Sequence, residues 1–419
     1  MKKYLIPLLY IIPAVVVFAF LGYSHPWLMT VREDGQLWLF SGDYLLQRLS
    51  EPGGLARYVG EFFVQFCYYV AWGAAVMALL FLFMQWLWGL VVRRIWRYYH
   101  HKEGQSGQLP VWLHFLSFVP HVLIWLLLLD INVQMTLPVA VALVLLLSLL
   151  VPQRGRLVFP VAVVLLLAGW WLAGPVVILL PFLAPWSLLP NKADRRGVAG
   201  GVVRLLILVF LLLGAIWLYA PHANRPMRQL LTGIDYVNNK KNMVGTPEEQ
   251  QYCLLVQLHL WNRLISVAAK HPPKSRACKY AVMLAEWKLW NGREQELLQC
   301  LHDTWGSLSS CAASLLMSEL YLQIGWFHMS QRAAHDAMVS YPNYNNSGRA
   351  LKRLAEMNLV TGHYDLVRKY AVILEQAPFY RSWARDIRQM ADHPELIERN
   401  ASVMGLRSIY HQTPDGVFY

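Results

Sequence analysis

The first residues that could do chemistry are carboxylates in a polar stretch near the N-terminus. Glu33, Asp34 and Asp43 lie in residues 24–60, which separate two long apolar runs. Carboxylates can bind a divalent metal that carries a diphosphate group, or they can act as a general base. We therefore take these three side chains as candidate catalytic residues. The alternative is that they are solvated charges of an ordinary loop.

A second set of polar residues interrupts the apolar runs themselves. His114 and His121 are seven positions apart and would share one face of a helix, and Asp130 follows at the end of the same run. Ionisable residues inside a bilayer are candidates for function because their burial is costly. An ion path needs several such groups on adjacent helices, so a secondary transporter is a minor alternative. The plainer interpretation is a hydrogen bond from His121 to a neighbouring helix.

Four of the five cysteines lie in the C-terminal half, at positions 253, 278, 300 and 311. Cys300 and Cys311 flank a predicted connection between helices and are a candidate disulfide, which an oxidising compartment would permit. The alternative is that all four are small buried hydrophobic residues. The spacing of cysteines and histidines matches no zinc site, so no metal is expected.

Sequence motifs for nucleotide, nicotinamide or serine-hydrolase chemistry are absent. The chain has no P-loop, no GxGxxG, no HExxH and no GxSxG in a suitable context. We therefore expect no cofactor.

The composition predicts that the elements carrying these residues lie in a membrane. Of the 419 residues 56% are hydrophobic and 15% are charged, whereas soluble domains are about one quarter charged. Residues 1–220 hold only 15 of the 37 Lys and Arg residues and 8 of the 25 Asp and Glu residues. This asymmetry predicts a transmembrane domain at 1–220, a linker at 221–245 and a soluble domain at 246–419.

A membrane-spanning helix needs about 20 mostly apolar residues. About seven segments meet or approach this length: 4–23, 62–92, 111–129, 133–151, 157–173, 176–189 and 202–220. The sixth is the weakest because it is short and contains two prolines, and Gly174 and Pro175 separate it from the fifth. Between the first two spans, residues 44–59 resemble an amphipathic interfacial helix broken at Pro52.

The distribution of Lys and Arg predicts the orientation, because basic loops are retained on the cytoplasmic side. With seven spans, 12 of the 15 basic residues of the membrane half fall on one face. The N-terminus is then cytoplasmic and the C-terminal domain lies outside, in the periplasm of a bacterial inner membrane. Basic residues between Arg93 and Lys102 are expected to contact anionic lipid, and no nucleic-acid partner is expected.

The C-terminal half has the pattern of paired helices. Thr246, Pro247 and Glu249 form a capping box that predicts a helix start, with the helix expected to continue to His271. Beyond it, glycines recur at positions 292, 325 and 362, at intervals of 33 and 37 residues. Such a period is typical of stacked helical hairpins.

In these residues the sequence resembles the tetratricopeptide repeats, over about residues 277–380. In that family a glycine permits the tight turn between two helices, and alanines such as Ala333, Ala334 and Ala337 let paired helices approach closely. The resemblance implies a curved surface that binds a protein or peptide. The alternative is a generic all-α bundle.

The layout of the N-terminal half also resembles that of multi-spanning glycosyltransferases that use lipid-linked sugars. These enzymes place an acidic residue in the first outer loop and carry an extra outward domain. The resemblance implies a glycosyl or phosphoglycosyl transferase with a lipid-linked substrate, in which Glu33, Asp34 or Asp43 is the acidic group. Only this alternative would require a divalent metal.

Residues 42–75, with the segments 43–46, 52–55 and 62–66, resemble an uncharacterised bacterial family known only as a domain of unknown function. That resemblance implies an inner-membrane location and no particular activity. We therefore expect an all-α protein: a membrane helix bundle followed by a tetratricopeptide-like domain. The leading hypothesis is a scaffold in the lipid bilayer that binds a periplasmic protein or peptide.

Overall fold

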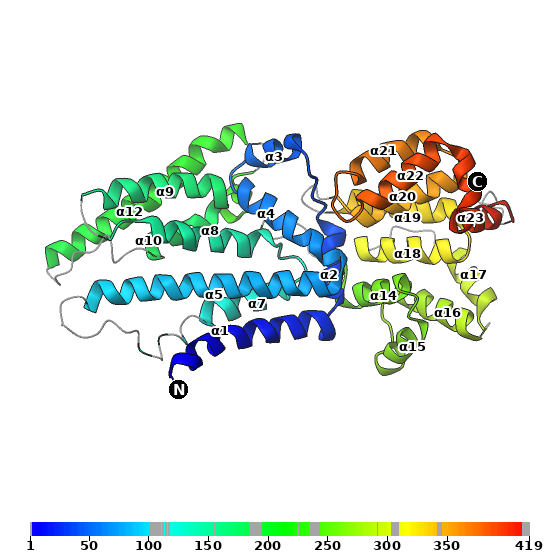
Figure 1. The fold of residues 1–419 in the computed structure, drawn as a ribbon, viewed down its shortest axis with the longest axis horizontal. Coiled ribbons are helices and arrows are strands. Elements are labelled where there is room, and N and C mark those ends of the chain that lie inside the picture. The colour runs from blue at the N-terminus through cyan, green and yellow to red at the C-terminus, as the bar shows by residue number, and fades with distance from the viewer. Residues whose placement is uncertain are drawn as a thin grey trace. The chain divides into compact units, whose positions relative to one another are not determined.

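The chain folds into two units, each built from two separate stretches of sequence. A computed structural model describes residues 2–100, 110, 113, 115, 118–153, 156–183, 195–223, 226–233, 236, 244–290, 292–302, 310–341 and 346–412. Unit 1 comprises Met1–His25 and Gly42–Asn238, and unit 2 comprises Pro26–Ser41 and Asn239–Tyr419. Among the described residues every regular element is a helix, which confirms the expected all-α class (Figure 1).

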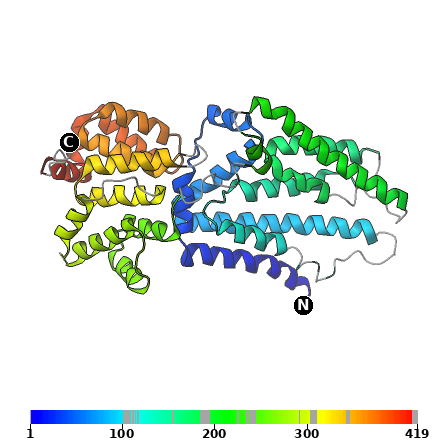
Figure 2. The same cartoon turned by 180° about the vertical axis from the view of Figure 1, so that it is seen from behind.

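Unit 1 is a bundle of apolar helices. Its longest are α1 (Lys2–Ala19), α5 (Val70–His100), α8 (Thr136–Leu150), α9 (Val158–Ala173) and α12 (Arg195–Tyr219). Shorter helices complete it: α3 (Gly42–Leu49), α4 (Gly54–Gln65), α7 (Phe118–Leu128), α10 (Leu180–Leu183) and α13 (Met227–Thr232). Helices α5, α8 and α9 run side by side in Figure 1 and, seen from behind, in Figure 2.

The number of candidate membrane spans differs from the predicted seven. Within the described residues three stretches are long and apolar enough to cross a membrane: Val70–Tyr98, Val158–Leu183 and Gly200–His222. The first apolar run would be a fourth only if it is counted together with Trp27–Gly35, which belongs to unit 2. Where the structure describes them, the predicted third and fourth spans contain the shorter helices Phe118–Leu128 and Thr136–Leu150, of 11 and 15 residues. Turns interrupt the apolar runs among the described residues.

One of these turns was predicted at Gly174 and is confirmed. Helix α9 ends at Ala173, and Gly174 adopts a φ of +76°, which favours glycine. Val177 packs so closely over Gly169 that a β-carbon at position 169 would collide with it. Eight residues of straight helix would separate these positions by about 12 Å. The chain therefore folds back at Gly174, so Val158–Leu183 has the length and composition of a membrane span without being one straight helix. Tyr236 closes the turn by accepting a hydrogen bond from the Val176 N–H at 3.2 Å.

The predicted second span also begins later than expected. Helix α4 ends at Gln65, and a short 3-10 turn separates it from α5 at Val70. The amphipathic helix predicted between the first spans is broken at Pro52 as expected, into α3 and α4. Gly54 permits this break, because a β-carbon there would lie 1.9 Å from the Arg48 carbonyl oxygen.

Unit 2 is a series of helices that pack mainly as antiparallel neighbours (Figure 1). They are α2 (Trp27–Gly35), α14 (Pro247–Gln257), α15 (Trp261–Lys270), α16 (Arg276–Trp290), α17 (Glu294–His302), α18 (Cys311–Gln323), α19 (Phe327–Ser340), α20 (Gly348–Thr361), α21 (Tyr364–Leu374), α22 (Arg381–Asp392) and α23 (Ala401–Gln412). Gly325 and Gly362, with φ of +85° and +86°, make the turns that join α18 to α19 and α20 to α21. The predicted hairpins are therefore present at these two glycines.

The capping box at the start of α14 is confirmed, but the helix is shorter than predicted. The Thr246 hydroxyl accepts a hydrogen bond from the Glu249 N–H, and the Glu249 carboxylate accepts one from the Thr246 N–H. The helix expected to reach His271 ends at Gln257. His259 has a φ of +53°, which no α-helix accommodates, so a second helix starts at Trp261.

Candidate functional site

The most distinctive polar site lies in unit 2, where residues 26–41 are built into the C-terminal helices. Helix α2 packs against α14 and α20, and its apolar residues Leu28, Met29 and Val31 are buried. The strand-like segment after it is held by its backbone: the Leu37 N–H donates to the Asn346 carbonyl at 3.0 Å, and the Phe40 N–H donates to the Gln376 carbonyl at 2.8 Å. A segment predicted as part of an outward loop is therefore an integral part of unit 2.

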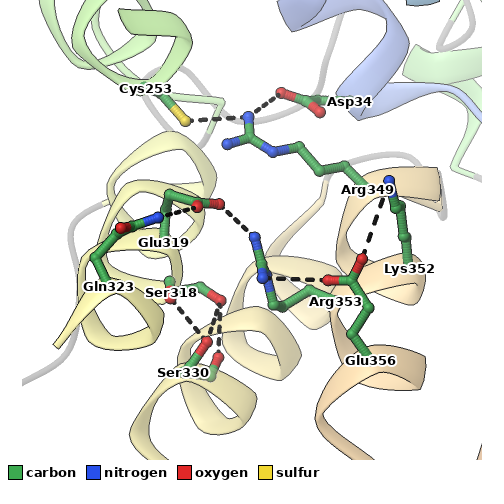
Figure 3. A network of polar contacts seen from close by, with 10 residues as sticks. All are labelled: Asp34, Cys253, Ser318, Glu319, Gln323, Ser330, Arg349, Lys352, Arg353 and Glu356. Carbon is green, nitrogen blue, oxygen red and sulfur yellow. Dashed lines mark hydrogen bonds and ion pairs between the residues drawn. The ribbon is translucent and has the colours of Figure 1, made fainter. Parts of the chain in front are cut away.

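Two of the three candidate acidic residues lie in this buried segment. Glu33 and Asp34 are 7% and 2% exposed. The Tyr380 hydroxyl donates a hydrogen bond of 2.5 Å to Glu33 Oε1. Asp34 Oδ2 lies 3.4 Å from Arg349 Nη1, which also donates to Cys253 Sγ at 3.2 Å (Figure 3).

Helix α20 supplies most of the charges that surround these acids. Its charged residues at positions 349, 352, 353 and 356 follow the i, i+3, i+4, i+7 spacing and share one face of the helix. Arg353 forms ion pairs with Glu319 of α18 and, at 3.1 Å, with Glu356 (Figure 3). Two neighbouring groups of polar contacts result: Asp34 with Arg349 and Cys253, and Arg353 with Glu319 and Glu356 (Figure 3).

The pKa values of the buried carboxyl groups at this site shift in different directions. Burial raises the pKa of Glu33 to about 8, and the neighbouring charge of Asp34 adds to the effect. Burial also raises the pKa of Asp34, although Arg349 opposes it. Burial acts in the same direction on Glu319, but there Arg353 and Arg349 prevail and hold the pKa of that carboxyl below its ordinary value. Glu33 is therefore protonated at neutral pH, whereas Glu319 is ionised.

This difference predicts how the stability of unit 2 depends on pH. Because the Glu33 pKa rises from 4.5 to about 8 on folding, the folded state binds the extra proton between these values. The contribution of Glu33 to the free energy of unfolding is therefore fully present below pH 4.5. It is lost as the pH rises from 4.5 through 8, by at most about 1.4 kcal/mol per pH unit. We expect Glu33→Gln to raise the midpoint of thermal unfolding at pH 8 and to flatten its decline between pH 6 and pH 8.

Near-ultraviolet circular dichroism of the detergent-solubilised full chain provides the measurement. The glutamine keeps an oxygen that can accept the hydrogen bond from Tyr380. A matched control is Glu395→Gln, which changes an exposed carboxyl group of the same unit. Parallel pH profiles of wild type and Glu33→Gln would contradict the assignment of a buried protonated carboxyl group.

The third candidate acid, Asp43, is not part of this site. It lies in unit 1, exposed in the first turn of α3. The acidic residues that the sequence places in one loop are thus divided between two units. Only Glu33 and Asp34 lie together.

A buried carboxylate of unit 1 was missed by the sequence analysis. Glu61 in α4 is 1% exposed and accepts hydrogen bonds from the Tyr44 hydroxyl at 2.5 Å, Arg48 Nε at 3.0 Å and Arg57 Nε at 2.9 Å. The spacing of Arg57 and Glu61, four residues apart on one helix, is the signal that could have indicated the pair.

The polar residues of the apolar runs do not form a row. His121 is 3% exposed and its ring lies 4.8 Å from that of Phe81, centroid to centroid. Asp130 is exposed and accepts two hydrogen bonds of 2.9 Å from Asn132, which stabilise a local turn. His114 lies outside the described residues. No line of ionisable groups therefore connects His121 to Asp130 in the part of the chain that the structure describes.

The cysteines are present as free thiols. Cys253, Cys278 and Cys311 are buried in the core of unit 2 and Cys300 is half-buried. No disulfide joins Cys300 to Cys311; Cys311 instead packs as a small hydrophobic residue at the start of α18. Burial raises the pKa of the Cys253 thiol to about 11, which leaves it protonated. Within the described residues no group of three or more His, Cys, Asp or Glu side chains is arranged to hold a metal ion.

Comparison with known proteins assigns the chain to a family but not to an activity. Residues 1–419 match the model of the family described as Family of unknown function (DUF6057), and the chain belongs to that family. No curated protein and no solved structure is significantly similar to it. The expected membership of an uncharacterised family is confirmed.

Proposed function

We propose that this protein is a membrane-anchored scaffold whose unit 2 binds a protein or peptide partner on the outer side of the membrane. The observation that supports this best is the way unit 2 holds residues 26–41. Helix α2 lies against α14 and α20, and the segment after it is hydrogen-bonded to Asn346 and Gln376; buried apolar side chains and the ion pair of Asp34 with Arg349 hold it as well. Proteins that bind helical or extended peptide ligands use the same interactions: apolar contacts with one helix face and backbone hydrogen bonds.

The surroundings of the acidic residues favour a scaffold over a transferase. A catalytic carboxylate has to reach its substrate. Glu33 and Asp34 are instead buried and bound to Tyr380 and Arg349 of the same unit. We infer that their role is to hold α2 in place.

The tetratricopeptide resemblance adds to this proposal. The turns at Gly325 and Gly362 recur after 37 residues, and Ala333, Ala334 and Ala337 of α19 are buried. Large apolar side chains also remain exposed on three helices of unit 2: Trp290 at 64%, Val339 at 69% and Val372 at 44%. Such residues are available to a partner.

The positions of basic residues support the proposed side of the membrane. Lys2 and Lys3 begin α1 and Arg195 and Arg196 begin α12, whereas the chain enters unit 2 after the opposite end of each helix. Basic helix ends are retained in the cytoplasm. We infer that unit 2 lies on the opposite side, which is the periplasm if the membrane is a bacterial inner membrane. This inference does not depend on the number of spans.

Photo-crosslinking of the full chain in native membranes tests the proposal. The crosslinking amino acid p-benzoylphenylalanine would replace Trp290, Val339 or Val372, one at a time. We expect at least one of these positions to form a discrete protein adduct, identified by mass spectrometry. Phe210 of α12, which is 70% exposed on a candidate span, is the matched control and should give no such adduct.

The same membranes can distinguish the scaffold from the transferase. Asp34→Asn should leave the adduct in place, because the amide retains a hydrogen-bond acceptor for Arg349. The proposal fails if none of the three positions of unit 2 forms a protein adduct, or if the adducts match those formed at position 210.

A further inference from the structure

One stretch of unit 2 carries basic residues without interspersed acids. Residues 258–285 contain no Asp or Glu. Five Lys and Arg residues lie exposed on α15, on the loop after it and on the first turns of α16: Arg263, Lys270, Lys274, Arg276 and Lys279. We call these five residues, together with Leu258 and Leu260, the basic-leucine surface.

The cations of this surface are not neutralised by the protein. None of the five forms an ion pair with a described residue, whereas Arg293, Arg368 and Arg388 elsewhere in unit 2 do. The nearby carboxylate of Glu248 accepts hydrogen bonds from the backbone N–H groups of Lys274, at 2.8 Å, and Ser275, at 3.4 Å. The Glu248 carboxylate therefore caps the backbone before α16 and forms no ion pair with these cations.

Apolar side chains lie next to these cations. The left-handed backbone of His259 ends α14 and leaves Leu258 and Leu260, on either side of it, 53% and 38% exposed. Helix α15 follows directly; it buries Leu264 on its inner face and exposes Arg263 and Lys270, seven residues apart, on its outer face. The apolar residues of α15 itself pack against the core, so the exposed apolar side chains are the two leucines before it. Exposed leucines beside a basic helix face are typical of segments that lie at a membrane surface.

We propose that the basic-leucine surface binds the surface of a bilayer that contains anionic phospholipid. Leu258 and Leu260 would enter the boundary between headgroups and acyl chains, and the five cations would contact lipid phosphates. Each such cation raises the partitioning onto an anionic bilayer about fivefold. The site is separate from the surface proposed for the protein partner, and it does not depend on that partner.

A bilayer is favoured over an acidic protein because of how the chain is connected. The same chain carries helices long and apolar enough to span a membrane, and it passes between the two units three times. Tethering of this kind raises the effective concentration of a nearby bilayer surface, so weak contacts are sufficient.

Depth-dependent fluorescence quenching of the full chain tests this proposal. Asn262 is exposed beside Leu260, and Cys300 is the one described cysteine that is not fully buried. A bimane label on Asn262→Cys, in a Cys300→Ser background, would report on the surface while both leucines remain. The protein is reconstituted into vesicles of phosphatidylcholine alone, or of phosphatidylcholine and phosphatidylglycerol at a ratio of about 7:3, each with a lipid carrying a doxyl quencher near the headgroup.

We expect at least fivefold stronger quenching in the anionic vesicles, and loss of this difference in about 0.5 M salt. The charge-reversed variant Lys270→Glu/Lys274→Glu/Arg276→Glu should lose it as well. Leu258→Ser/Leu260→Ser should weaken it without any change of charge. The matched control is Lys369→Glu/Arg385→Glu/Arg399→Glu, which reverses three exposed cations elsewhere in unit 2 and should retain the difference.

Equal quenching of the parent protein in both vesicles would overturn the proposal and leave the surface to an acidic protein. Loss of the difference in the control variant would also overturn it, because the effect would then reflect net charge alone. These readouts are independent of the crosslinks at positions 290, 339 and 372. The membrane site and the partner surface can therefore fail separately.

Discussion

Replacement of Arg349 by alanine is expected to lower the free energy of unfolding of unit 2 by about 3–5 kcal/mol at neutral pH. The guanidinium lies 3.4 Å from Asp34 and only 12% of its side chain is exposed. Its removal leaves a buried carboxylate without this counter-ion, and it also removes the donor to Cys253. Because Asp34 belongs to the segment inserted from the N-terminal part of the chain, α2 should detach first.

Limited proteolysis of the detergent-solubilised full chain in increasing urea measures this effect. Cleavage within residues 26–41 should begin at a lower urea concentration in Arg349→Ala than in wild type. The matched control is Arg388→Ala, which breaks a pair of 3.3 Å with Glu375 in which the arginine is 45% exposed. Exposed pairs contribute about 1 kcal/mol or less, so this variant should behave almost as wild type.

A second substitution separates the charge from the packing. In the Arg349→Ala background, Asp34→Asn removes the uncompensated charge and should restore part of the lost stability. If Arg349→Ala and Arg388→Ala shift the cleavage midpoint equally, then the buried pair does not hold residues 26–41 in unit 2.

The second large effect is expected in unit 1. Glu61→Ala should destabilise this unit by about 3–5 kcal/mol, because it breaks the buried ion pair with Arg57, whose side chain is 5% exposed. It also removes the acceptor for the Tyr44 hydroxyl and for Arg48, so α3 loses its polar contacts with α4. Glu61→Gln, which keeps two hydrogen-bonding groups, should lie between Glu61→Ala and wild type.

Thermal unfolding of the purified full chain in detergent provides this measurement. Asp43→Ala is the matched control: it also removes a carboxylate from the α3–α4 region, but an exposed one. Its expected cost is below about 1 kcal/mol, the contribution of an acidic residue in the first turn of a helix. Equal losses in Asp43→Ala and Glu61→Ala would show that burial of Glu61 contributes nothing.

Local patterns in the sequence predict those features that neighbouring residues decide. The capping box at Thr246, the break at Gly174 and the hairpin turns at Gly325 and Gly362 all follow from side-chain and backbone rules that act over a few residues.

Hydropathy was less successful in counting membrane spans. A window of apolar residues does not distinguish one long helix from two short helices joined by a turn. The 3-10 turn at Phe66–Tyr68 illustrates this, since it separates α4 from α5 inside one predicted span. The break at His259 was missed because a left-handed histidine has no local sequence signal.

The all-α class, the apolar first half and the helix-capping positions were determined by the sequence itself, since each depends on composition or on residues a few positions apart. The place of residues 26–41 was decided only by the tertiary structure. Glu33 meets Tyr380 across 347 positions of sequence, and Asp34 meets Arg349 across 315. No periodicity links such partners, because their contact depends on how α2, α14 and α20 pack. The same packing buries the two acids in unit 2, where they contact Tyr380 and Arg349, so they are not solvated charges of a loop.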